Sequence, residues 1–118
     1  MRPDEFNKIV DDMTDKIKAT LKRKATEYNL DEDRLSVFKR AAKLQHQTAP
    51  QALLGMMTKH IVSIYDYIED NVTFTKELAT EKITDALNYL ILLYALLAED
   101  NFGEEKKWVK QINILKKK

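Results

Sequence analysis

Two rows of polar side chains stand at helical spacing in the second half of the chain, where they could hold a metal ion. Glu81, Asp85 and Asn88 follow one another at steps of four and three residues, so they share one face of a helix. A second row lies upstream at steps of four, three and four residues, and consists of Lys59, Ser63, Asp66 and Asp70. Carboxylate oxygens are the ligands that Mg²⁺ prefers, and a bound Mg²⁺ can in turn bind a polyphosphate. If the two helices pack antiparallel, the rows predict a site for a divalent cation.

The same residues also allow a purely structural interpretation. Lys59 could pair with Asp85, and Glu81 with Lys82 or with another helix, which would give a buried or half-buried ion network. His60, next to Lys59, could be a histidine at the edge of the core bonded to a carbonyl, or it could be a ligand or a base. Spacing alone leaves both interpretations open.

A candidate phosphate-binding and base-stacking set lies between residues 24 and 40. Arg34 and Lys39 could bind phosphates, while Tyr28 and Phe38 could stack on a base. Alternatively, the two aromatic residues belong to the core and the cations are solvated. Arg34 is predicted to stand just inside a helix N-terminus, where a cation is unfavourable. For Arg34, a functional or partnered role therefore has about the same weight as a solvated side chain.

The elements that must position these residues are predicted to be helices. Residues 86–98 are apolar on nearly every side, which is typical of a helix in the middle of a bundle. They are fewer than the roughly 20 residues that a membrane span requires, so we expect no membrane partner. The predicted central helix begins after a cap at Thr75, continues to about Ala98 and is terminated by the segment 101–103.

Three other helices follow from apolar residues that recur at three and four residue steps. They are predicted over about residues 4–28, from a cap at Asn29 or Asp31 to Gln45, and from a cap at Thr48 to about Asp70. A short basic helix is predicted over 104–118, where the terminal lysines suit the helix dipole.

The sequence therefore predicts an all-α fold, with residues 1–118 forming one domain of four to five helices. Gly55 stands inside the third predicted helix, and we interpret it as a point of close helix packing. The apolar helix surfaces also lead us to expect a homo-oligomer.

Composition excludes several classes of function. The chain has no cysteine, so a disulfide framework, a cysteine zinc site and a thiol nucleophile are ruled out. Two glycines are too few for a glycine-rich phosphate loop, and a net charge of +1 makes no case for nucleic acid as a partner. The first residues do not resemble a signal peptide, so we expect a cytoplasmic protein.

Four segments together resemble small all-α proteins encoded by phages and prophages, often described as nucleotide modification associated. The segments are residues 27–28 (EY), 33–42 (DRLSVFKRAA), 52–66 (ALLGMMTKHIVSIYD) and 81–90 (EKITDALNYL). The pattern is in turn similar to the all-α nucleoside triphosphate pyrophosphohydrolases of the MazG and dimeric dUTPase kind. The resemblance implies the cytoplasm of an infected bacterium as the location.

The resemblance implies a nucleotide or nucleotide-derived ligand and, for the enzymes, Mg²⁺ or Mn²⁺ held by carboxylates. Asp66, Glu69, Glu81 and Asp85 would bind the metal, with Lys59 also in the catalytic set. Tyr28, Arg34, Lys39, Asn88 and Tyr89 would bind the nucleotide. The enzymes pair a GluxxGlu with a GluxxAsp motif, whereas the residue three before Asp85 is Lys82.

Three hypotheses follow from this departure. The first is a magnesium-dependent pyrophosphohydrolase. The second is a non-catalytic sponge that sequesters linear or cyclic nucleotide signals of bacterial anti-phage defence, and the third is a helical interaction module without a ligand.

Overall fold

The structure, a computed structural model, describes residues 1–27, 33–70 and 73–101, and within them it is built from helices. These are α1 (Pro3–Glu27), α2 (Ser36–Gln45), α3 (Ala49–Glu69) and α4 (Lys76–Asn101), and no strand occurs in this part of the chain. The predicted all-α bundle is therefore confirmed. The helix predicted over 104–118 and the candidate ligand residue Tyr28 lie outside the described residues. None of the described helices is long and apolar enough to cross a membrane.

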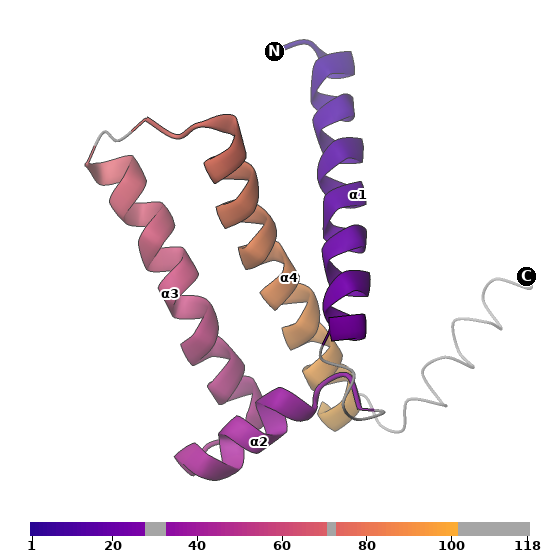
Figure 1. The fold of residues 1–118 in the computed structure, drawn as a ribbon, viewed down its shortest axis with the longest axis vertical. Coiled ribbons are helices and arrows are strands. Elements are labelled where there is room, and N and C mark those ends of the chain that lie inside the picture. Colours follow the sequence, from indigo (N-terminus) through magenta and orange to yellow (C-terminus); the bar gives the residue numbers. More distant parts are fainter. Residues whose placement is uncertain (28–32, 71–72, 102–118) are drawn as a thin grey trace, which may run out of the picture.

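The three long helices lie side by side in one layer, with α4 in the middle (Figure 1). Helix α4 packs against α3 on one side and α1 on the other, and α3 and α4 run antiparallel as their short connection requires. Helix α2 crosses one end of the layer and packs on α3. Part of the apolar pattern of these helices is buried against neighbours in the layer, and part of it is exposed.

The hydrophobic core lies at the end of the layer where α2 meets α3 and α4. Leu35, Phe38, Leu53 and Leu96 form one buried cluster there, and Leu53 is completely inaccessible to solvent. Helix α1 contributes little to this cluster, because every residue from Met1 to Asp12 is exposed. Packing energy is therefore concentrated around α2 and the adjoining ends of α3 and α4.

Helices α3 and α4 begin where the sequence predicts. The Gln51 backbone N–H donates to Thr48 Oγ1 at 3.3 Å, and the Thr48 N–H donates to Gln51 Oε1 at 2.9 Å, which completes a capping box. Pro50 occupies the first turn, where it removes no helical hydrogen bond. At the start of α4, the Leu78 N–H donates to Thr75 Oγ1 at 3.1 Å, so Thr75 is also a cap.

The predicted start of α2 was wrong. Its N-cap residue is Leu35, which provides no side-chain cap, instead of Asn29 or Asp31. Asp33 accounts for the difference, because its Oδ1 accepts a hydrogen bond of 2.9 Å from the Leu35 N–H and its carbonyl accepts one of 3.2 Å from the Ser36 N–H. An aspartate that binds the backbone two residues ahead favours a turn over a helix. Arg34 therefore lies in a turn before α2 and not in its first helical turn.

The interpretation of Gly55 as a close packing point was also wrong. A Cβ atom built on Gly55 would meet no other atom within 4 Å, so no neighbouring helix approaches this residue. The residue is exposed on α3. Gly55 therefore has no packing role, although glycine in a helix is entropically unfavourable.

Gly55→Ala is accordingly expected to raise the free energy of unfolding by about 1 kcal/mol, because alanine restricts the unfolded chain and fits the open space. Urea denaturation of the variant and the parent protein at equal concentration measures this difference. A loss of stability would show that another group covers Gly55 in solution.

Candidate functional site

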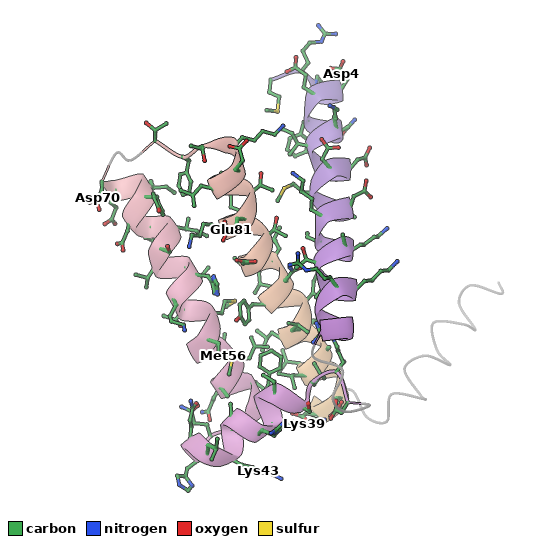
Figure 2. All side chains as sticks on the ribbon, in the orientation of Figure 1. Asp4, Lys39, Lys43, Met56, Asp70 and Glu81 are labelled. Carbon is green, nitrogen blue, oxygen red and sulfur yellow. The ribbon has the colours of Figure 1, made fainter. Side chains whose placement is uncertain are left out.

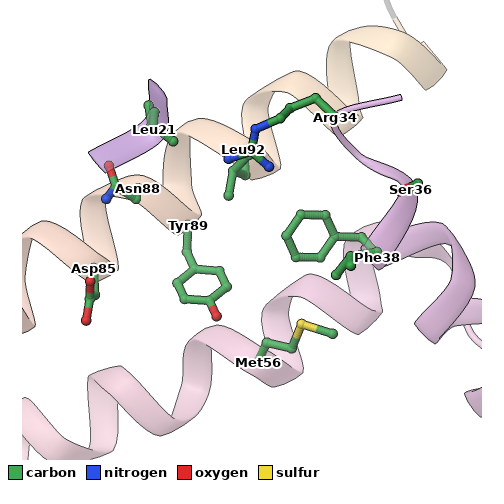
Figure 3. Close-up of a pocket in the computed structure, with 10 residues that line it drawn as sticks. Leu21, Arg34, Ser36, Phe38, Met56, Asp85, Asn88, Tyr89 and Leu92 are labelled. Atoms are coloured by element: carbon green, nitrogen blue, oxygen red, sulfur yellow. The ribbon is translucent and has the colours of Figure 1, made fainter. Parts of the chain in front are cut away.

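A pocket of about 290 Å³ lies where α2 meets α3 and α4, with one residue of α1 at its rim (Figure 3). It is lined by Leu21, Arg34, Ser36, Val37, Phe38, Met56, Asp85, Asn88, Tyr89 and Leu92. Its volume is at the lower end of the range for small-molecule sites, and its mixture of apolar walls with a few polar groups is typical of them. Four of the residues predicted from the sequence meet in this pocket, namely Arg34, Asp85, Asn88 and Tyr89.

Aromatic and aliphatic side chains form the walls of the pocket. Figure 3 shows the rings of Phe38 and Tyr89 directed into the same space, close to Met56. The Tyr89 ring also contacts the His60 ring, with centroids 5.1 Å apart and planes inclined by 38°. Phe38 is 5% exposed, so it is a core residue, as we considered from its spacing, and a wall of the pocket as well. Such walls suit a flat, apolar group.

Asn88 is the most unusual polar residue of the pocket. It is 3% exposed, and neither its amide nitrogen nor its amide oxygen has a hydrogen-bond partner among the described residues. Leaving a buried amide unpaired costs about 1–3 kcal/mol, which is why native proteins rarely do so. Thr84, one turn earlier, has a buried hydroxyl in the same condition, but it lies against α1 outside this pocket.

Two charged groups are placed at the edges of the pocket. Arg34 is exposed, and Figure 3 shows its side chain reaching over α4 beside Leu92. No carboxylate of the described part of the chain forms an ion pair with it. Asp85 is 26% exposed, and its Oδ2 lies 3.9 Å from Nδ1 of His60. The pocket therefore has one cationic edge and one acidic edge.

The candidate metal ligands differ in their exposure to solvent. Asp66, Glu69 and Glu81 are exposed, as is the candidate phosphate ligand Lys59, whereas Asp85 is half-buried. Within residues 1–27, 33–70 and 73–101, no three histidine, aspartate or glutamate side chains form a group able to hold a metal ion.

Lys39, predicted to bind phosphate, lies on α2 (Figure 2). It is bound to two carboxylates. Its Nζ lies 2.5 Å from Asp33 Oδ2 and 2.6 Å from Glu99 Oε1, which connects the start of α2 to the end of α4. The hydrogen bonds to Asp33 and Glu99 raise the pKa of Lys39 above its ordinary value of 10.5. The hydrogen bond from Lys39 and that from the Leu35 backbone hold the pKa of Asp33 below 3.8.

Lys39→Met is expected to lower the free energy of unfolding by less than about 1 kcal/mol near neutral pH, because the paired groups are more than one-third exposed. The depressed pKa of Asp33 means that its contribution is lost as the pH falls through the native-state value, below 3.8. The raised pKa of Lys39 means that its contribution is lost as the pH rises beyond 10.5.

Denaturant titrations at several pH values measure this difference, with Lys43→Met as a control at an exposed lysine of the same helix. The gap between Lys39→Met and the parent should be widest between the two limits. A gap that is constant across the pH range would contradict the assignment of the ion pairs.

Sequence reasoning left the role of His60 open and did not assign Met56 or Leu92 to the site. His60 rather than Lys59 lies against Asp85, although the two neighbours differ by only one position. One position is about 100° around a helix, so the side of α3 that faces α4 decides between them. The sequence does indicate which side of α3 faces α4, because Leu53, Met56 and His60 recur at steps of three and four.

The chain matches none of the known protein families, curated proteins or solved structures with which it was compared.

Proposed function

We propose that the protein binds a nucleotide in the pocket between α2, α3 and α4, and that it holds this ligand without chemically changing it. The observation that carries the proposal is the Asn88 amide, which is buried in the pocket wall with its donor and its acceptor both unpaired. A ligand that supplied the missing partners would recover the free energy that the unpaired amide costs.

The chemistry of Asn88 indicates what the ligand must present. A carboxamide offers a donor and an acceptor side by side, which matches the adjacent acceptor and donor atoms on the edge of a nucleobase. The neighbouring aromatic rings of Phe38 and Tyr89 suit the flat face of such a base. Base recognition therefore requires only groups that already line the pocket.

Arg34 is suited to the phosphate end of the same ligand. Its guanidinium lies at the exposed rim, so the phosphate could stay partly solvated while the base occupies the small apolar interior. Arginine binds phosphate oxygens through paired hydrogen bonds that are stronger than those of neutral groups. The ligand class that fits these groups is a nucleotide, as expected for a sponge that sequesters nucleotide signals.

A magnesium-dependent pyrophosphohydrolase is the second candidate function, and Asp85 favours it. This carboxylate lines the pocket, and Glu81 stands one helical turn away from it. A ligand-bound arrangement would have to bring further carboxylates to Asp85. The same experiment separates the two candidates.

The test incubates the purified full chain with ribonucleotides, deoxynucleotides and cyclic nucleotides, in the presence and absence of Mg²⁺ or Mn²⁺. After ultrafiltration, the filtrate and the heat-released retained fraction are analysed by chromatography. We expect an intact nucleotide in the retained fraction without any metal. Arg34→Gln should weaken its retention at least about tenfold, whereas Arg40→Gln, at an exposed arginine of α2 outside the pocket, should not.

Retention of no nucleotide under any condition would overturn the proposal and leave the interaction module as the remaining hypothesis. A monophosphate that appears only with metal, and disappears in Asp85→Ala, would establish the hydrolase instead. Equal losses in Arg34→Gln and Arg40→Gln would place the phosphate elsewhere.

A further inference from the structure

The face of the helix layer opposite the pocket is strongly apolar. Asp85 and Ile83 are two residues apart on α4, and Met56 and Leu54 are two residues apart on α3, so each pair projects to nearly opposite sides of its helix. Asp85 and Met56 both line the pocket. Ile83 and Leu54 must therefore lie on the opposite side of the layer.

Large apolar side chains continue along this side of both helices. Six of them are between 43% and 64% exposed, and we define them as the apolar face: Leu54, Tyr65, Ile68, Ile83, Leu90 and Tyr94. Half-buried Ile61 and Leu87 lie between them in the same helical stripes. Single exposed apolar residues are common on soluble proteins, but a continuous two-helix stripe marks an interaction surface.

We infer that a second copy of this chain covers the apolar face, with α4 of one copy packed antiparallel on α4 of the other. The inference does not depend on the proposed nucleotide site. The described helices form a single layer and leave one of its apolar surfaces without a second layer, whereas stable domains are built from at least two packed layers. Antiparallel pairing of two such layers would give a four-helix bundle made of α3 and α4 from each copy.

The spacing along α4 is self-complementary for such a pairing. Thr80, Ile83, Leu87, Leu90, Tyr94 and Leu97 recur at alternating steps of three and four, which is the seam pattern of paired helices. In a two-fold antiparallel register centred between Leu87 and Leu90, Leu87 meets Leu90 of the other copy. The same register places Ile83 opposite Tyr94, so all central positions of the seam are apolar.

The N-terminal end of α4 favours the antiparallel orientation. Lys76 continues the seam at this end, four residues before Thr80. Antiparallel pairing separates the two Lys76 side chains, and it also opposes the two helix dipoles favourably. Parallel pairing would place Lys76 against Lys76.

The apolar face supplies most of the area that a stable dimer buries. Six large side chains that are about half exposed offer on the order of 600 Å² per copy. Ile61, Leu87 and the flanking residues add to this area. A standard stable interface buries roughly 800 Å² on each partner.

Sedimentation equilibrium of the full chain tests the inference. The parent protein should show twice the 13.8 kDa mass of one chain at micromolar concentration. Leu90→Glu should weaken dimerisation at least about 100-fold, because both copies would bring a carboxylate into the apolar seam. Leu44→Glu, at an exposed leucine of α2 outside the apolar face, should leave the dimer intact.

A monomeric parent protein would overturn the inference and would indicate that another segment, such as residues 102–118, or a different protein covers the apolar face. A dimer that persists unchanged in Leu90→Glu would also overturn it. Circular dichroism of each variant confirms that its helices are retained.

Disulfide trapping tests the register even if Leu90→Glu fails to fold, because the chain has no cysteine of its own. A mixture of the single variants Ile83→Cys and Tyr94→Cys should give a crosslink between the two different chains. In the antiparallel register two copies of position 83 are about 16 Å apart along the helix, too far for a disulfide. A crosslink from Ile83→Cys to itself would overturn the antiparallel arrangement.

Discussion

Asn88→Leu is expected to make the ligand-free protein more stable by about 1–2 kcal/mol and to abolish nucleotide retention. In the structure the amide is desolvated and has no partner within the described residues, whereas leucine has the same branching of side-chain heavy atoms and no polar atom to satisfy. A gain in stability combined with a loss of binding is the signature of a residue kept for a ligand. Urea denaturation and nucleotide retention, each at a fixed protein concentration, measure the two effects.

Thr84→Val is the matched control for this prediction. Thr84 also has a buried, unpaired polar atom on α4, but it lines the contact with α1 and not the candidate pocket. The control should gain stability and retain the nucleotide. A loss of more than 1 kcal/mol in Asn88→Leu would contradict the interpretation, since it would mean that the amide makes favourable hydrogen bonds before any ligand arrives.

Leu53→Ala is expected to lower the free energy of unfolding by about 3–5 kcal/mol. Leu53 is fully buried in the cluster with Leu35, Phe38 and Leu96, so its truncation removes apolar burial and leaves a cavity. Such a loss is a large fraction of the 5–15 kcal/mol that usually stabilises a domain.

Leu44→Ala makes the same chemical change at a leucine that is 83% exposed. It should alter stability by no more than about 0.5 kcal/mol. Similar losses in Leu53→Ala and Leu44→Ala would contradict the location of the core at the end of the layer beside α2.

Local signals in the sequence were sufficient for the helices and for several of their ends. Thr48, Pro50 and Thr75 act through hydrogen bonds or backbone angles within three residues, so their roles could be predicted from the chain alone. The start of α2 could not, because a capping aspartate and a turn-forming aspartate have the same local chemistry. Whether a cap or a turn forms depends on where Asp33 and Leu35 pack.

Predictions that required knowledge of neighbouring helices were less successful. Gly55 is compatible with both close packing and open space, and only the positions of the other helices show that the space is open. Asp85, Asn88 and Tyr89 line one pocket because the polar row and its neighbour lie on one helix. The partner on α3 was misassigned by one position, since the rotation of α3 about its axis is set by its apolar stripe and not by its charges.

The two-residue separation of Ile83 and Asp85 also determines whether a ligand can bind in the pocket while the apolar face is covered. Because these neighbours project from opposite sides of α4, an occupant of the apolar face does not obstruct the mouth of the pocket. A dimer built on that face would carry two outward-facing pockets, and each could fill and empty while the copies remain associated. Saturation at two ligands per dimer would then be independent of protein concentration.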